Sequence, residues 1–464
     1  MKPANESTPS YERLDRRDLH RIPQLSQLTP DERFAIEVVS AVFPFRVNRY
    51  VVEHLIDWSR APDDPLYRLT FPHADMLAPE DFARVADLVR ADAPRERLEP
   101  VVRELQRRAN PHPAGQRDLN VPTLDGERVP GIQHKYRETV LFFPAQGQTC
   151  HAYCSYCFRW PQFVGHGDLK FASREASTLV RYLRAHPEVT SVLITGGDPL
   201  VMKTEVLERI IAPLLEADLP HLASIRIGTK ALAYWPHRFL GREGDALLAL
   251  FERVVRAGKT LALMAHFSHP RELEVEPAQR ALARVRRSGA VVRCQAPLVR
   301  HVNDDPSVWA ELWRLEVQLG AIPYYMFVER DTGPRHYFEV PLARAFGIYR
   351  TAFQHVSGLA RTVRGPSMSS TPGKVCIEGV AEIAGERVFV LKFLQARDPD
   401  WVARPFFARY DERATWLDQL RPAFGEPEFF FERGLAALCD HGTALDTQAE
   451  PVRRRRLTVF REVA

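Results

Sequence analysis

Cysteine is scarce in this chain, with six among 464 residues. That density is far below the one found in small disulfide-stapled domains. Long apolar runs are lacking as well, because no stretch approaches the ~18–20 apolar residues of a membrane-spanning helix. The N-terminus, MKPANESTPSYERLDRRD, has no apolar segment of a secretory signal. We therefore expect a cytoplasmic protein with no membrane partner.

An excess of charge of one sign is also lacking. The chain holds 63 Lys and Arg against 59 Asp and Glu, a formal net charge of +4, which gives no basic footprint for nucleic acid. With 45% hydrophobic and 26% charged residues, the composition is typical of a globular protein rather than a disordered one. The length allows about three domains of ~150 residues, or one large barrel with flanking segments.

The apolar spacing changes along the chain and predicts three parts. Residues 1–130 are expected to form a helical segment with a Pro-rich linker, because 31–43, 47–60, 79–91 and 96–109 repeat apolar residues every three to four positions. In 131–360, six short apolar runs alternate with six helical patterns, which predicts an α/β fold with a parallel sheet, a partial (β/α)6 barrel. Residues 361–464 predict an α+β extension with a hairpin at 380–394. The runs start near residues 139, 191, 224, 261, 291 and 323, and helices are expected over 172–185, 204–216, 244–257, 275–288, 306–319 and 342–357.

Three of the cysteines stand together directly after the first of these strands. Cys150, Cys154 and Cys157 have the spacing C-x3-C-x2-C. A structural zinc site closes with four ligands, usually in two knuckles; His151 is a candidate fourth ligand, but no second knuckle is visible. Three thiolates from one loop can instead hold three irons of a 4Fe-4S cluster, which leaves the fourth iron open. An open iron at the end of a parallel strand predicts a reaction site.

This pattern resembles the radical S-adenosylmethionine (radical SAM) superfamily. There the amino and carboxylate groups of S-adenosylmethionine (SAM) chelate the open iron, and the reduced cluster cleaves SAM to a 5'-deoxyadenosyl radical. The resemblance implies that Gly196, Gly197 and Asp198, at the end of the second strand, receive the amino group of SAM, since glycines allow close backbone approach. It implies that His266 and Gln295, at later strand ends, lie near SAM, although buried side chains there can also simply satisfy backbone groups.

Further segments resemble the lysine 2,3-aminomutase family. In that family the substrate amine joins pyridoxal phosphate (PLP) as an imine, the adenosyl radical removes a β-hydrogen, and nitrogen migrates to the neighbouring carbon. An imine can be attacked and reopened by a neighbouring radical, whereas a bare amine cannot shift easily. The resemblance implies an isomerase that uses a 4Fe-4S cluster, SAM and PLP, takes an amino acid, and receives electrons from a flavodoxin-type or ferredoxin-type donor. The segments, in the family's order, are VPGIQHKYRETVLFF, CSYCFRWPQFVG, VLITGGDPL, IRIGTKALAYWP, AHFSHPRE, QAPLVRHVND and PYYMF.

The resemblance also assigns individual residues. PLP chemistry needs a lysine; Lys374, in SSTPGKVC, matches the family's PLP lysine, and Lys230 is the alternative. Lys135 and Arg137 match basic residues that face the PLP phosphate. Arg159 matches the arginine that binds the substrate carboxylate, a role that suits the bidentate guanidinium fork.

The chain departs from the lysine enzymes where they bind the distal end of lysine. They hold its ammonium with two aspartates; here Arg330 stands in the first register, with Asp331 one residue later, and Ser367 stands in the second. Strand alternation sends Arg330 and Asp331 to opposite sides. If Arg330 points inward, we expect an acidic or neutral polar distal group, such as that of glutamate; if Asp331 does, a basic group. With Ser367 in place of an acid, we predict a substrate other than free L-lysine.

Several alternatives stay open at the level of sequence. One is a radical SAM enzyme of another reaction type that uses no PLP. Another is a relative that modifies a lysine of a translation factor, and a third is a non-enzymatic iron–sulfur or zinc protein. The cysteines with which the lysine enzymes bind zinc between subunits are absent near the C-terminus, so their tetramer is not implied, although a homo-oligomer stays open.

Overall fold

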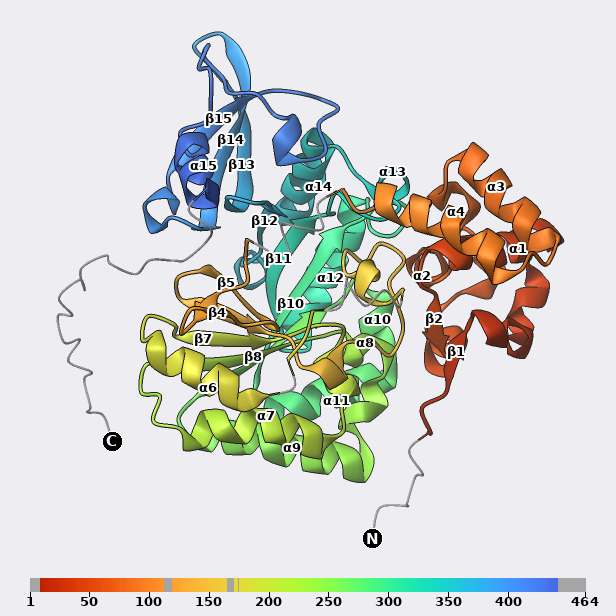
Figure 1. The fold of residues 1–464 in the computed structure, drawn as a ribbon, viewed down its shortest axis with the longest axis horizontal. Helices are drawn as coiled ribbons and strands as arrows, with labels where there is room; N and C mark the ends of the chain where they lie inside the picture. The colour runs from red at the N-terminus through yellow and green to blue at the C-terminus, as the bar shows by residue number, and fades with distance from the viewer. Residues whose placement is uncertain (1–8, 112–118, 165–170, 174, 441–464) are drawn as a thin grey trace.

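One sheet of eleven strands organises the molecule (Figure 1). The computed structural model describes residues 9–111, 119–164, 171–173 and 175–440. The strands lie in the sheet in chain order, from β5 to β15, and β6 to β11 are parallel. The six expected strands are therefore confirmed, while closure into a barrel stays a prediction. They are β6 (Thr139–Phe142), β7 (Ser191–Ile194), β8 (Ser224–Thr229), β9 (Thr260–His266), β10 (Val291–Leu298) and β11 (Ile322–Val328).

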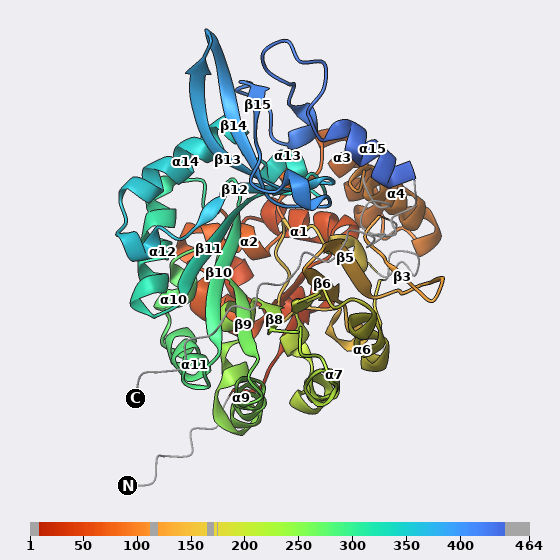
Figure 2. The same ribbon diagram turned by 90° about the vertical axis from the view of Figure 1, so that its left-hand side faces the viewer.

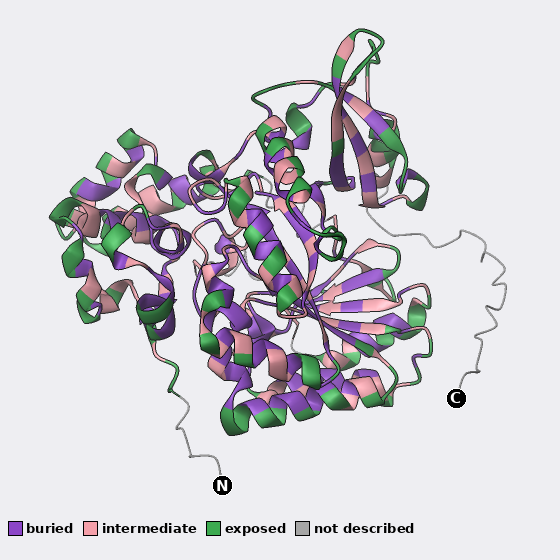
Figure 3. Ribbon diagram, turned by 180° about the vertical axis from the view of Figure 1, so that it is seen from behind, coloured by how far each residue is buried: buried purple, intermediate pink, exposed green. Residues whose placement is uncertain are grey.

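Helices connect the parallel strands at the expected places. Gly258 and Gly289, just beyond the ends of α9 and α11, adopt positive φ, which glycine does without strain. Figures 2 and 3 show helices along the outside of the sheet, with buried strands between them and exposed outer helix faces. The helices are α6 (Ala176–Ala185), α7 (Thr204–Glu216), α9 (Gly241–Arg256), α11 (Glu276–Arg287), α12 (Pro306–Gln318) and α14 (Leu342–Gln354).

A helical unit at the N-terminus lies beside the sheet (Figure 1, red and orange). The prediction of a helix over 47–60 is confirmed in part. Residues 49–55 are helical, with π-helical geometry at Val51–Leu55, but the segment begins in β2 and ends in a 3-10 turn at Trp58–Arg60. The reason is tertiary, because β2 pairs with β1. One hydrophobic cluster joins this unit to the parallel strands, and the boundary at residue 130 stays a prediction. The elements are α1 (Pro30–Val42), α2 (Pro65–Thr70), α3 (Pro79–Arg90), α4 (Arg95–Arg108), β1 (Arg13–Asp15) and β2 (Arg46–Asn48).

The C-terminal part extends the same sheet. β12 (Arg364–Ser369) pairs with β11 in parallel, and β13 (Gly373–Ile383), β14 (Glu386–Ala396) and β15 (Pro405–Arg409) continue antiparallel. The predicted hairpin at 380–394 is confirmed as β13–β14, and α15 (Glu432–Asp440) follows. A second hydrophobic cluster, rich in aromatic side chains, lies under these strands.

The two ends of the sheet approach each other. The first strand, β5 (Ile132–Tyr136), is antiparallel to β6. From it, the ammonium of Lys135 donates a hydrogen bond to the carbonyl of Ser370, just before β13. Arg397, after β14, donates to the carbonyl of Leu119 at 3.1 Å. These contacts bring residues from the start and the end of the sheet around one space.

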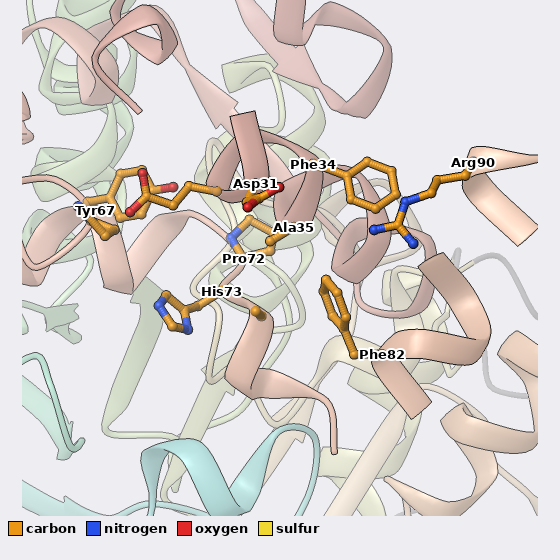
Figure 4. Close-up of a pocket in the computed structure, with 11 residues that line it drawn as sticks. Asp31, Phe34, Ala35, Tyr67, Pro72, His73, Phe82 and Arg90 are labelled. Carbon is orange, nitrogen blue, oxygen red and sulfur yellow. The ribbon is translucent and has the colours of Figure 1, made fainter. Parts of the chain in front are cut away.

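A surface cavity of about 350 Å³ lies in the N-terminal unit (Figure 4). The Arg90 guanidinium covers the Phe34 ring there, 4.7 Å from its centroid. The predicted site residues are not among those that line it. Within the described ranges, no helix is both long enough and apolar enough to cross a membrane.

Candidate active site

The cysteine loop, residues 150–157, is held by the N-terminal unit. The backbone N–H of Tyr153 donates to the carbonyl of Arg46 at 2.8 Å, and that of Ser155 donates to the carbonyl of Leu69 at 2.9 Å. Because loops carry backbone groups that must find partners, these long-range bonds fix the path of the loop. The sheet alone does not position the thiols.

Cys150, Cys154 and Cys157 are half-buried, and their thiols lie within electrostatic range of one another. Burial raises the pKa of each, and the charge of Cys154 adds to that effect at Cys157, whose pKa reaches about 12. Three such thiols cannot all lose their protons unless a positive charge joins them, and iron would supply it. Among the described residues, no group of three or more His, Cys, Asp or Glu side chains is arranged to hold a single metal ion. In a 4Fe-4S cluster each thiolate would hold a separate iron. His151, the candidate zinc ligand, packs its ring edge-on against Tyr11.

The Gly-Gly-Asp loop packs against the residue before Cys150. A Cβ on Gly197 would lie 2.3 Å from the carbonyl oxygen of Thr149, so only glycine fits. Gly196 adopts φ +147°, and the N–H of Asp198 donates to Thr149 at 2.6 Å. The Gly-Gly-Asp loop therefore supports the start of the cysteine loop through Thr149. The contact of Gly196, Gly197 and Asp198 with SAM stays a prediction. The Asp198 carboxylate accepts from the backbone N–H of Leu200 and Lys230 and from the Thr229 hydroxyl, at 2.8–2.9 Å.

His266 and Gln295 lie opposite each other on β9 and β10. The Gln295 amide nitrogen is 2.8 Å from His266 Nε2; with the amide as donor, this ring nitrogen is the acceptor. Burial, followed by the positive charges of Lys230 and Arg159, lowers the pKa of His266 to about 3. The ring is therefore neutral and faces the same space as Arg159.

Arg159 lies against two aromatic rings. Its guanidinium carbon is 4.7 Å from the centroid of Phe143 and 4.9 Å from that of Phe158. Burial lowers its pKa to about 10, so it remains charged at neutral pH. Its guanidinium has no hydrogen bond or ion pair with another described residue, although its backbone carbonyl accepts a hydrogen bond from the N–H of Gln162 at 3.0 Å. A half-buried guanidinium without a carboxylate partner is suited to bind an anion that arrives with a ligand.

The guanidinium groups of Arg330 and Arg159 both contact the ring of Phe158. The Arg330 guanidinium carbon is 5.4 Å from the Phe158 centroid and 5.8 Å from that of Trp416. Its buried Nε has no hydrogen-bond partner in the described chain, and the nearby carboxylate oxygen of Asp331 is 3.9 Å away. The positive charge of Arg330 lowers the pKa of Arg159, so the two guanidinium groups share one environment.

Lys135 extends this set of cations toward β13. Burial, and then the charges of Arg397, Arg330 and Lys374, lower its pKa well below the usual value for lysine. Arg159, Arg330, Lys135 and Lys374 are thus successive electrostatic neighbours. We call these four residues the cation row; it runs from the cysteine loop to β13.

Lys374 ends the cation row with an amine that faces aromatic rings. Its Nζ is 4.0 Å from the centroid of Tyr325 and 5.1 Å from that of Phe327. Burial, and then Arg364 and Arg226, lower its pKa to about 7. An uncharged amine is the form that attacks a carbonyl, so Lys374 is suited to bind an aldehyde cofactor near neutral pH.

Other predicted residues are placed differently. Lys230, the alternative lysine, pairs with the buried Glu272, 2.7 Å away, and offers no free amine. Arg137 is half-exposed and pairs with Glu138. Ser367 is buried on β12, and its hydroxyl is 3.5 Å from the carbonyl oxygen of Met326.

Sequence reasoning missed the aromatic surfaces against which the cations lie. They come from separate strands and loops, and the adjacency of Phe158 and Arg159 was the one local signal. The missed aromatic residues are Phe143, Phe158, Tyr325, Phe327 and Trp416.

A loop with three clustered thiols after the first parallel strand, next to buried cations, is the arrangement of a radical SAM enzyme. No protein-family model matches the chain. A protein of Aquifex aeolicus (strain VF5), provisionally named L-lysine 2,3-aminomutase, is 32% identical over 395 residues, which are 85% of this chain and 92% of that protein. The chain belongs to the L-lysine 2,3-aminomutase family.

Two further relatives and one solved structure show the extent of the similarity. The L-lysine 2,3-aminomutase of Escherichia coli (strain K12) is 33% identical over 53% of this chain and 68% of its own length. That of Clostridium subterminale is 31% identical over 50% and 52%. A radical SAM methyltransferase from Sphaerobacter thermophilus reaches a TM-score of 0.37 at 18% identity, over 53% of this chain and 72% of that one, a likeness too weak to bear on the fold.

Lysine 2,3-aminomutases use a 4Fe-4S cluster, SAM and PLP. The residues of this chain fit these groups: three neighbouring thiols suit the cluster, and Lys374 offers an amine of low pKa to PLP. Burial and neighbouring cations disfavour the protonated form of Lys135 by lowering its pKa, and a phosphate beside it would favour that form.

Proposed function

We propose that the protein is a PLP-dependent radical SAM aminomutase, which moves an amino group between adjacent carbons of an amino acid other than free L-lysine. The observation that carries this proposal is the cation row between the cysteine loop and β13. When bound, the cluster with SAM supplies a 5'-deoxyadenosyl radical, and PLP supplies a carbonyl that takes the substrate amine.

The residues at the two ends of the cation row have different roles: one binds the substrate and the other binds the cofactor. Arg159 binds the α-carboxylate through its two-pronged donor fork and, two residues after Cys157, orients the neighbouring carbons toward the cysteine loop. Lys374, partly uncharged near pH 7, would hold PLP through its amine, and Lys135 would hold the phosphate. The neutral His266 is an electrostatic neighbour of Arg159 and accepts a hydrogen bond from Gln295.

The middle of the cation row supports an anionic distal group on the substrate. A substrate ammonium beside Arg330 would meet Arg159 and Lys135 as well, and buried like charges cost several kcal/mol. A carboxylate there would instead pair with Arg330, whose Nε lacks a partner. The nearby Asp331 already lies next to Arg330. We therefore propose an acidic or neutral polar distal group, as in glutamate or glutamine.

The test is turnover of an amino-acid panel. The enzyme, reconstituted anaerobically, is incubated with dithionite, SAM, PLP and glutamate, glutamine or lysine, and 5'-deoxyadenosine and β-amino acids are measured by mass spectrometry. We expect a β-amino acid from glutamate or glutamine, lost in Arg330→Met but kept in the control Arg344→Met, whose exposed side chain pairs with Asp304. Efficient conversion of L-lysine that survives Asp331→Ala would contradict the proposed substrate.

The cluster must be reduced before SAM is cleaved. We therefore also propose an external electron donor of the flavodoxin or ferredoxin type. We further propose a cytoplasmic location.

A further inference from the structure

Lys230 belongs to a buried network that reaches the sulfur of Cys154. Its Nζ pairs with Glu272 at 2.7 Å and lies 4.7 Å from the centroid of the Tyr234 ring. Tyr234 is buried at the end of α8 (Ala231–Tyr234), and its hydroxyl oxygen is 3.2 Å from Cys154 Sγ. An ion pair, an aromatic ring and a thiol are therefore in sequential contact.

The network is anchored on the backbone from two sides. The carbonyl of Tyr234 accepts a hydrogen bond from the Asn48 side chain at 2.9 Å. The Glu272 carboxylate accepts from the backbone N–H groups of Ser268 and His269. These hydrogen bonds fix the backbone of Tyr234 and the carboxylate of Glu272 on either side of the contact with Cys154.

The hydrogen bond has a defined direction once Cys154 binds iron. A coordinated thiolate carries no proton, so the Tyr234 hydroxyl must donate and the sulfur accept. Hydrogen bonds to ligand sulfurs and nearby charges set the reduction potential of iron–sulfur clusters. The Tyr156 side chain also bonds to Cys154, and the backbone of Arg159 bonds to Cys157. Tyr234 is the one of these groups whose ring lies against the Lys230 ammonium.

We propose that Tyr234, supported by the Lys230–Glu272 ion pair, positions Cys154 and raises the reduction potential of the 4Fe-4S cluster. A donor at the sulfur stabilises the reduced cluster, which carries one more negative charge, over the oxidised cluster. The Lys230 ammonium on the face of the tyrosine ring adds positive charge on the same side. The proposal concerns the cluster and holds whichever amino acid is the substrate.

The test is a redox titration of the reconstituted full-length protein, followed by electron paramagnetic resonance of the reduced cluster. Tyr234→Phe keeps the ring and removes the hydroxyl. We expect about tenfold less reduced cluster at a fixed potential, a shift of ~59 mV to lower potential for one electron. Tyr182→Phe is the matched control, because that buried hydroxyl bonds to His134 and not to a cysteine. The signal comes only from loaded protein, so partial loss of iron does not hide the shift, and an unchanged midpoint in Tyr234→Phe would overturn the proposal.

The ion pair is tested in the same titration. Lys230→Met combined with Glu272→Gln removes both charges and leaves no buried charge unpaired. We expect a shift in the same direction as in Tyr234→Phe and recovery of the wild-type midpoint in Lys230→Arg. A wild-type midpoint in the double variant would remove Lys230 and Glu272 from the proposal.

Discussion

The side-chain amide of Asn48 donates a hydrogen bond of 3.2 Å to the carbonyl of His151, inside the cysteine loop. The same amide reaches the carbonyl of Tyr234, and its oxygen accepts from the N–H of Val51. A single buried side chain thus joins the N-terminal unit, the cysteine loop and α8.

Asn48→Ala leaves these backbone groups buried without partners. We expect the free energy of unfolding to fall by about 1–3 kcal/mol, the usual effect of unsatisfied buried polar groups, and the iron content after reconstitution to fall with it. Urea denaturation of the apoprotein and iron quantification provide the measurements. The exposed Gln27→Ala serves as the control; equal iron content in the two variants would contradict the role given to Asn48.

Replacement of Cys150, Cys154 or Cys157 by Ala should abolish the visible iron–sulfur absorbance and the cleavage of SAM, because each thiolate holds a different iron. The matched controls are Ala variants of Cys294, Cys376 and Cys439, the other free cysteines. Full cluster content in Cys154→Ala would contradict the assignment.

The lowered pKa of Lys374 predicts how PLP capture depends on pH. Below pH 7 the amine is protonated and unreactive, and above pH 7 it is neutral, so the rate of imine formation should rise between about pH 6 and 8. An ordinary lysine would show this rise near its usual pKa of ~10.4. The imine absorbance measures the rate, and borohydride reduction with peptide mapping locates the lysine.

Arg364→Met removes a positive charge near Lys374 and should move the rise to higher pH. Lys392→Ala is the matched lysine control, because that ammonium pairs with Glu378. Undiminished PLP capture in Lys374→Ala would show that another lysine binds PLP.

Arg159→Lys should separate cluster chemistry from substrate binding. The cluster and slow uncoupled formation of 5'-deoxyadenosine should persist, while turnover falls about a hundredfold, because lysine cannot reproduce the bidentate fork and small misplacements are costly. Unchanged turnover would make Arg159 a packing residue for Phe143 and Phe158.

The sequence predicts what is periodic or local. The six parallel strands and their helices follow from apolar spacing, and the thiols follow from one short motif. The apolar spacing of 47–60 predicts a helix throughout. Its first residues form a strand instead because Asn48 pairs with Arg13, more than thirty residues away, and local spacing does not report such a contact. The cation row was hidden for the same reason, since Lys135 lies on β5 and Arg330 follows β11, and the two residues become electrostatic neighbours only in the folded sheet.

The order of the strands has a consequence for synthesis. Because the eleven strands lie side by side in chain order, each one finds its neighbour already made when it leaves the ribosome. β13 is among the last to be added, and it carries Lys374. With Lys374 as the proposed PLP lysine, we expect capture of PLP to be a late event for the nascent polypeptide, because a translation product that stops before β13 has the three thiols but lacks this amine.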